Sequence, residues 1–71
     1  MNTAITMYSV WNGTDGIYAS PEPFATRAEA SAFIAKFRQR FEFQGYYLTS
    51  DGLRIHPRDI ELVIEPGDFE N

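Results

Sequence analysis

The clearest pattern in the chain is an amphipathic helix over residues 26–41. Thr26 is suited to the N-cap position, and Glu29 three residues later completes a capping box. Gly45 follows the segment as a stop signal. A helix with one apolar stripe has to be covered by another element, and this requirement limits the folds that the chain can adopt. The residues that form the stripe at helical spacing are Ala30, Phe33, Ile34, Phe37 and Phe41.

The segment that precedes this helix has the composition of a β-hairpin. Residues 5–12 are rich in β-branched and aromatic side chains and end at an Asn-Gly pair, which predicts a strand that runs into a turn. Residues 16–20 form a short apolar run, and the sequence "NGTDG" between the two runs predicts a hairpin. Alternation along the first strand places one row of side chains on each face: Thr6, Tyr8 and Val10 on one, and Ile5, Met7, Ser9 and Trp11 on the other.

Residues 45–66 contain the one histidine of the chain and have the pattern of turns and strands. In "YYLTSDGLRI" two apolar runs flank Ser-Asp-Gly, which predicts a hairpin. Pro57 disfavours helix at His56, and "PRD" then allows one tight turn. The Pro-Gly pair at 66–67 is expected to end the last strand and to leave residues 66–71 as a frayed tail. In "IELVIE" the expected alternation places Ile60, Leu62 and Ile64 toward the helix and Glu61, Val63 and Glu65 on the other side.

These elements predict a single domain over residues 1–71 with an α+β fold in two layers. One amphipathic helix packs on one face of a small antiparallel β-sheet, in the order β-β-α-β-β-β or similar. The last strand is expected beside the first. The chain has 71 residues and no cysteine, so its stability has to come from an apolar core built from its eleven Phe, Tyr and Trp residues. We expect Phe33 and Phe37 to lie in that core.

The net charge of −4 conceals a basic centre and an acidic end. Residues 26–42 carry four basic and two acidic side chains, whereas residues 59–71 carry five acidic side chains and no basic one. A net acidic chain repels phosphate backbones at long range, so nucleic acid is disfavoured as a partner. The first residues lack the pattern of a signal peptide, and no apolar run approaches the roughly 20 residues of a membrane span. We therefore expect a soluble cytoplasmic protein without membrane contact.

His56, with Asp51 and Asp59, is the one group that resembles a catalytic constellation. It lacks a convincing nucleophile, because Thr49 and Ser50 occupy positions where a hairpin favours polar residues. One histidine with scattered carboxylates does not form a tetrahedral metal set, and "NGTDG" lacks the lysine of a phosphate-binding loop. The sequence therefore predicts a protein that is not an enzyme and that binds no metal or cofactor.

The sheet face away from the helix is the strongest candidate for a binding surface. One helix covers only one face, and aromatic residues and methionine are enriched where proteins meet. The expected protein-binding residues are Met7, Trp11, Tyr18, Tyr47, Glu61, Val63 and Glu65. One alternative is a homodimer formed through the same face. The other is a nucleic-acid-binding accessory protein that uses the basic residues of the helix, Arg27, Lys36, Arg38 and Arg40.

The run "FATRAEASAFIAKFRQRF", followed by "QGYYLTSDGLRI" and an acidic strand, resembles a widespread group of small uncharacterised bacterial, phage and plasmid α+β proteins. The resemblance covers roughly residues 7–65 and implies no fixed activity. In size and charge the chain is also similar to anti-CRISPR-type phage inhibitors. That likeness implies a protein-binding inhibitor of a host complex, whose acidic C-terminal strand imitates nucleic-acid phosphates. The alternative is that these acidic residues only solvate an edge strand.

Overall fold

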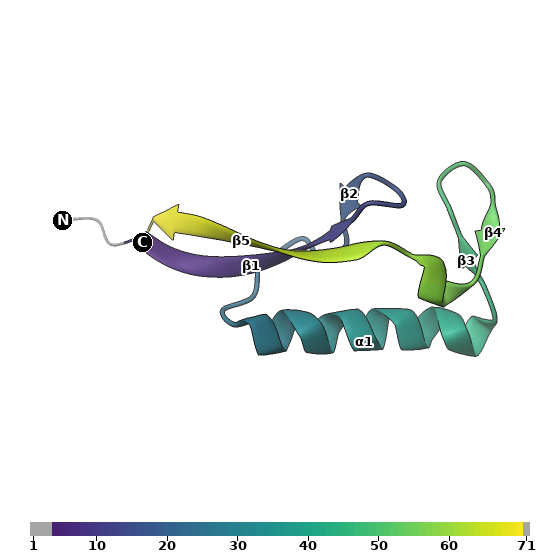
Figure 1. Cartoon of the computed structure of the whole chain (residues 1–71), viewed down its shortest axis with the longest axis horizontal. Helices are drawn as coiled ribbons and strands as arrows, with labels where there is room; N and C mark the ends of the chain where they lie inside the picture. Colours follow the sequence, from purple (N-terminus) through teal and green to yellow (C-terminus); the bar gives the residue numbers. More distant parts are fainter. Residues whose placement is uncertain (1–3, 71) are drawn as a thin grey trace.

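The computed structural model describes residues 4–70, which form one α-helix and two small antiparallel sheets (Figure 1). Strands β2, β1 and β5 form a three-stranded sheet in that order, and β3 pairs with β4 in a separate hairpin. The predicted α+β fold, with one helix and a small antiparallel sheet, is confirmed. In chain order the elements are β1 (Ala4–Asn12), β2 (Ile17–Tyr18), α1 (Arg27–Gln44), β3 (Tyr47–Leu48), β4 (Arg54–Ile55), the 3-10 helix η1 (Pro57–Asp59) and β5 (Leu62–Glu70).

The pairing of β1 with β5 joins the two ends of the described chain. Nine residue pairs run in antiparallel register, from Ala4 opposite Glu70 to Asn12 opposite Leu62. Strand β2 adds two more pairs at the other edge of β1. The expectation that the last strand lies beside the first is therefore confirmed.

Strand β5 continues through residues 66–70, so the predicted strand end and frayed tail are wrong for these residues. Pro66 lies opposite Tyr8, whose N–H and C=O already pair with Phe24 on the other side of β1, at 2.8 and 2.7 Å. The Tyr8–Pro66 pair is therefore a non-hydrogen-bonded pair, and the nitrogen of Pro66 points to the free edge of the sheet, where no donor is needed. Asn71, the last residue of the expected tail, lies outside the described residues.

Helix α1 begins and ends where the sequence predicts. Thr26 Oγ1 accepts a hydrogen bond from the Glu29 backbone N–H at 3.1 Å, and the Thr26 hydroxyl donates to Glu29 Oε1 at 3.2 Å. Gly45 ends the helix at φ 102°, a conformation that favours glycine, and its N–H donates to the Phe41 carbonyl at 2.8 Å. These bonds satisfy backbone groups that a helix leaves open at its ends.

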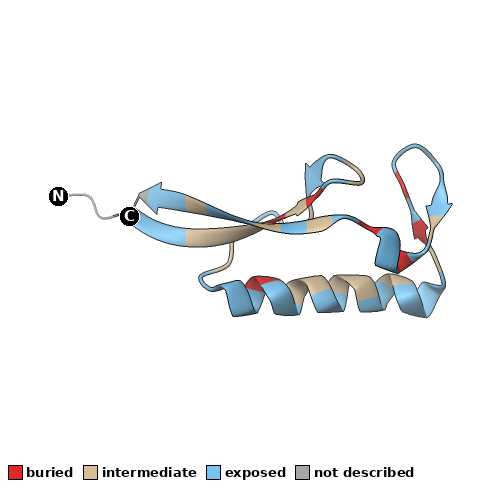
Figure 2. Ribbon diagram, in the orientation of Figure 1, coloured by how far each residue is buried: buried red, intermediate tan, exposed pale blue. Residues whose placement is uncertain are grey.

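The core lies where α1, the inner face of the sheet and the β3–β4 hairpin meet (Figure 2). Phe33 and Phe37 of the predicted stripe are half-buried, because the sheet beneath the helix is narrow. A row of aromatic rings follows the helix, with 4.8–5.9 Å between the centroids of neighbouring rings, and consists of Phe24, Phe33, Phe37, Phe41 and Tyr47. The buried apolar residues around it are Val10, Ala30, Tyr47 and Ile60.

The 3-10 helix η1 ties the start of β5 to helix α1. Pro57 is buried, and its carbonyl accepts a hydrogen bond from Arg38 Nη1 at 2.8 Å. His56 caps η1, because its Nδ1 accepts a hydrogen bond from the Arg58 N–H at 3.1 Å. The tight turn predicted for "PRD" is confirmed, and His56 is exposed.

The β1–β5 ribbon extends beyond the N-terminal end of helix α1 (Figure 1). The molecule measures 49 × 22 × 14 Å along its principal axes and has a radius of gyration of 13.9 Å. A compact domain of this length would have a radius of gyration of about 11 Å. The part of the ribbon beyond the Tyr8–Phe24 bridge therefore projects from the body of the molecule as an arm.

Replacement of Phe37 by alanine tests the aromatic row. The rings of Phe33, Phe41 and Tyr47 surround Phe37 with centroids 5.1–6.2 Å away, so the truncation leaves a cavity among them. We expect Phe37→Ala to lower the free energy of unfolding by about 3 kcal/mol in urea melts. Phe43→Ala is the control, because Phe43 is 97% exposed. The control should change that free energy by less than about 0.5 kcal/mol, and equal losses for the two variants would contradict the packing described.

Candidate functional site

The sheet has one face that is covered by α1 and one face that points away from it. Val10 is buried on the covered side, and Arg27 of α1 lies over the Tyr8 ring, 5.2 Å from its centroid. The intervening residues of β1 therefore point to the other side, which they share with the residues opposite them on β2 and β5. This surface, the outer face, consists of Ile5, Met7, Ser9 and Trp11 of β1, Tyr18 of β2, and Val63, Glu65, Gly67 and Phe69 of β5.

Large side chains of the outer face are open to solvent. Trp11 points to this face as predicted, but it is half-buried rather than fully exposed. Its ring packs edge-on against Tyr18, with 4.9 Å between centroids and 75° between planes, and the two rings form an aromatic platform. The most exposed of these side chains are Ile5 at 43%, Tyr18 at 55%, Val63 at 43% and Phe69 at 41%.

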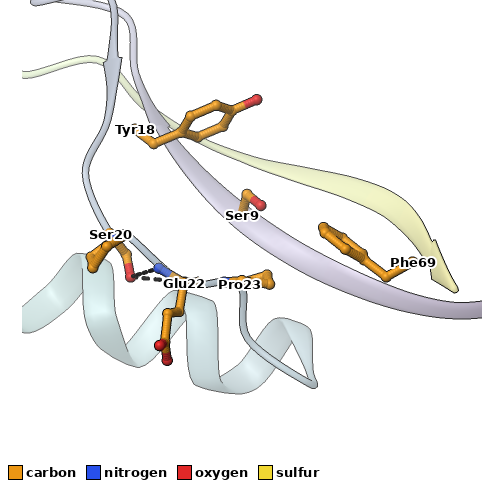
Figure 3. Close-up of a pocket in the computed structure, with 7 residues that line it drawn as sticks. Ser9, Tyr18, Ser20, Glu22, Pro23 and Phe69 are labelled. Atoms are coloured by element: carbon orange, nitrogen blue, oxygen red, sulfur yellow. Dashed lines mark hydrogen bonds between the residues drawn. The ribbon is translucent and has the colours of Figure 1, made fainter. Parts of the chain in front are cut away.

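A groove of about 490 Å³ lies between the outer face and the loop that leads from β2 to α1 (Figure 3). Tyr18 and Phe69 stand at its two ends, and Ser9 lies between them. Its volume is within the range of about 300–1,000 Å³ that is usual for ligand pockets. The Ser20 hydroxyl donates to the Glu22 carbonyl at 2.8 Å and so closes the loop. The loop lines the groove with Ser20, Pro21, Glu22 and Pro23.

Glu65 supplies the negative charge of the outer face. It lies opposite Ser9 in the β1–β5 ladder, and its Oε1 accepts a hydrogen bond from the Tyr18 hydroxyl at 3.3 Å. Because Ser9 and Tyr18 both line the groove, the carboxylate lies beside it. No basic residue occurs among the nine that make up the outer face. The surface therefore combines aromatic walls with one carboxylate.

The structure brings together most of the predicted protein-binding residues. Glu61 is not among them, because it precedes β5 and its side chain lies beside Gly13 in the turn after β1. Tyr47 is 6% exposed and packs edge-on against Phe41, with 4.8 Å between ring centroids, so its predicted place on a binding surface is wrong. The outer face contains the other five, Met7, Trp11, Tyr18, Val63 and Glu65.

Tyr47 is buried because its hydroxyl joins the turn after β1 to the β3–β4 hairpin. The hydroxyl accepts a hydrogen bond from Asn12 Nδ2 at 3.0 Å and donates to Asp15 Oδ2. The other Asp15 oxygen accepts from the Ser50 backbone N–H at 2.8 Å. Asn12 Oδ1 accepts from the backbone N–H groups of residues 14 and 15 at 3.0 and 3.2 Å. The segment "NGTDG" is thus the joint between the main sheet and the second hairpin.

This joint shifts the pKa of both titrating groups in it. The hydrogen bond from the Tyr47 hydroxyl, and then that from the Ser50 backbone, lower the pKa of the Asp15 carboxyl below its ordinary value. Burial, and then the hydrogen bond to Asp15, raise the pKa of the Tyr47 phenol. The pair is therefore held as an ionised carboxylate and a neutral phenol.

The four basic residues considered for nucleic-acid binding lie on two separate flanks of α1. At 3.6 residues per turn, Arg27 and Arg38 fall on one flank and Lys36 and Arg40 on the other, with the apolar stripe between them. Arg27 lies over a tyrosine ring of β1, and Arg38 donates to a carbonyl of η1. The structure therefore does not gather these four side chains into one basic surface.

The remaining candidates for chemistry are separate from one another. His56 uses Nδ1 as the cap of η1, and Asp51 is exposed in the turn between β3 and β4. Within residues 4–70, no cluster of three or more His, Asp or Glu side chains could hold a metal ion. The one α-helix of that same range lacks the apolar length that crossing a membrane requires.

Two residues of the outer face, Ile5 and Phe69, are absent from the protein-binding residues predicted from the sequence, although Ile5 was expected on the face of Met7 and Trp11. Ile5 has the same parity as Met7 and Trp11 along β1, and this parity is a signal that places it on the same face. Phe69 falls in the segment expected to be a tail, so only the full length of β5 reveals its position. The groove was missed because it depends on the path of the loop at residues 20–23.

No protein-family model, curated protein or solved structure matches the chain. The outer face is therefore interpreted from its own residues and geometry.

The joint at Asp15 should make the fold sensitive to acid. Because the folded-state pKa of Asp15 is lowered, its contribution to stability is present above the unfolded pKa and is lost as pH falls through the folded one. We expect the free energy of unfolding to fall more for the wild type than for Asp15→Asn between about pH 6 and about pH 2. Urea melts at a series of pH values measure both slopes, and equal slopes would contradict this role. The raised pKa of Tyr47 acts at the alkaline limit, where its contribution is lost as pH rises through the folded pKa.

Proposed function

We propose that this protein is a non-enzymatic protein-binding module and that its binding surface is the outer face. The observation that carries the proposal is that exposed apolar side chains gather beside a groove on the side of the sheet opposite α1. Ile5 lies directly opposite Phe69, and Trp11 lies between Tyr18 and Val63, so these side chains form two neighbouring groups rather than scattered positions. Scattered apolar residues are ordinary on a protein surface, whereas exposed apolar side chains grouped beside a groove are typical of a contact site.

We expect a partner to contact the side chains of the outer face rather than to pair with the edge of the sheet. Backbone groups of Ile64, Pro66 and Asp68 point to the free edge of β5, because their neighbours along the strand pair with β1. Pro66 has no N–H and interrupts the middle of this edge, which is a common protection against strand addition. A partner that extends the sheet would need that missing donor. Docking on the outer face does not need it.

An inhibitor that occupies a basic surface of a larger complex is one form that such docking can take. Glu65 supports this form of the proposal, because it lies on the outer face beside the groove. Asp68 lies on the opposite face of the ribbon, where its Oδ1 accepts a hydrogen bond from the Thr6 hydroxyl at 3.2 Å. Acidic residues of β5 therefore alternate between two faces, and the proposal rests on one carboxylate rather than on a row that imitates phosphates.

Capture experiments with the full chain test the proposal. The tagged protein is used as bait in a lysate of its native host, and the bound proteins are quantified by mass spectrometry. Val63→Lys places a charge beside Trp11 on the outer face and should reduce capture of specific partners by about tenfold or more. Ala35→Lys is the matched control, because Ala35 is exposed on the side of α1 opposite the apolar stripe.

Both variants should keep the wild-type melting temperature, since each change is at a solvent-exposed position. Equal capture by the wild type and Val63→Lys would contradict the proposal. So would a loss of partners that occurs only in Ala35→Lys, because the binding surface would then be on the helix.

A further inference from the structure

We propose that the partner presents a lysine or arginine side chain with apolar neighbours, and that this basic side chain pairs with Glu65 beside the groove between Tyr18 and Phe69. The inference rests on the proposed function, since it names the kind of partner that the outer face fits. The occupant of the groove is a segment of another protein.

The charge of the outer face favours a partner with a basic side chain. Glu65 is the carboxylate of the outer face, and none of the other eight residues there is basic. The Tyr18 hydroxyl donates one hydrogen bond to Glu65, but an ionised carboxylate can accept about four. A partner that covered Glu65 without a cation would bury an unpaired charge, which is strongly unfavourable. A basic side chain on the partner removes that cost.

The shape and chemistry of the groove also favour a lysine or arginine side chain. Glu65 accepts a hydrogen bond from the hydroxyl of Tyr18. The ring of Tyr18 closes one end of the groove, and the ring of Phe69 closes the other (Figure 3). In that view the side chain of Glu22, which lines the groove, extends away from both rings. The carboxylate bonded to the Tyr18 hydroxyl is that of Glu65. Aromatic faces attract cations, and the long stems of lysine and arginine pack well on apolar walls. Pro21 and Pro23 supply such a wall.

The same charge argues against a second copy of this chain as the occupant. A two-fold dimer through the outer face would place that face against itself. It would bring two Glu65 carboxylates into one interface, and the face has no basic residue to neutralise them. Pairing of two copies through the free edge of β5 is also disfavoured, because Pro66 lacks the backbone N–H that such pairing would use. A partner of opposite charge meets neither obstacle.

A displayed library of random peptides, selected on the full chain, tests the inference. The selected peptides should carry lysine or arginine with apolar neighbours. The synthetic form of the best peptide is then titrated against the wild type and variants by calorimetry. We expect Glu65→Lys to weaken its binding about 30-fold or more. Glu42→Lys is the control, with the same charge change at an exposed position on α1, and should bind as the wild type does.

A charge exchange gives the sharpest result. The peptide in which the basic residue is replaced by glutamate should bind Glu65→Lys better than it binds the wild type. Circular dichroism melts of Glu65→Lys check that the fold is intact, and Glu65→Gln provides a second variant that removes the charge without reversing it. Failure of the exchanged pair to bind, together with unchanged binding of the original peptide to Glu65→Gln, would overturn the pairing with Glu65.

The remaining outcomes separate this inference from the proposed function. Selected peptides without a basic residue, whose binding is lost in Val63→Lys but not in Glu65→Lys, would overturn the basic partner and leave the outer face as a binding surface. Peptide binding that is insensitive to Val63→Lys would overturn both proposals. A selection that yields no peptide would show that the groove does not take a short segment. A dimer found by sedimentation equilibrium and dissociated by Val63→Lys would assign the face to a second copy.

Discussion

The antiparallel pairing of β1 with β5 is the interaction on which the other contacts of the structure depend. It joins residue 4 to residue 70 and provides the surface on which helix α1 rests, with Val10 buried beneath it. Strand β2 contributes only two residue pairs, so it has no sheet to join without β1 and β5. Helices in proteins gain most of their stability from the packing of their apolar face. The row of phenylalanines on α1 therefore needs this ladder as its partner.

Alternation along the ladder gives each strand two rows of side chains with different roles. Inward residues such as Val10 and Tyr8 meet the helix, and outward residues such as Trp11 and Val63 form the outer face. Because the two rows share a backbone but few contacts, changes on one face act largely independently of the other. A fold of this size can in this way keep its small core constant while its exposed face is adapted to a partner.

Local signals in the sequence were sufficient to predict the helix and the turns. Thr26, Gly45 and the Asp-Gly hairpin sequence each specify a backbone conformation through their own chemistry, so they needed no knowledge of the rest of the fold. Alternation along β1 also placed Met7 and Trp11 correctly on the face away from the helix. Periodicity therefore predicted the layers and part of the candidate site.

The errors arose where long-range contacts decide the outcome. Strand β3 has two residues, so no pattern of alternation could show that Tyr47 turns inward toward Asp15. Pro66 was interpreted as the end of a strand, because its compatibility with β5 depends on which edge of the strand is unpaired. The half-burial of Trp11 depends in the same way on the ring of Tyr18 from the neighbouring strand. Each of these features follows from the arrangement of the sheet rather than from neighbouring residues in the chain.

The distance along the chain between β1 and β5 has a consequence during synthesis on the ribosome. The shortest connection in the ladder, from Asn12 to Leu62, already spans the helix and the second hairpin. The sheet can form only after β5 has emerged from the exit tunnel, whereas α1 emerges earlier and can adopt its local structure at once. In the interval the phenylalanines of the nascent helix have no sheet to cover them. The nascent chain thus passes through a stage in which molecular chaperones can bind the same apolar stripe that later becomes the core.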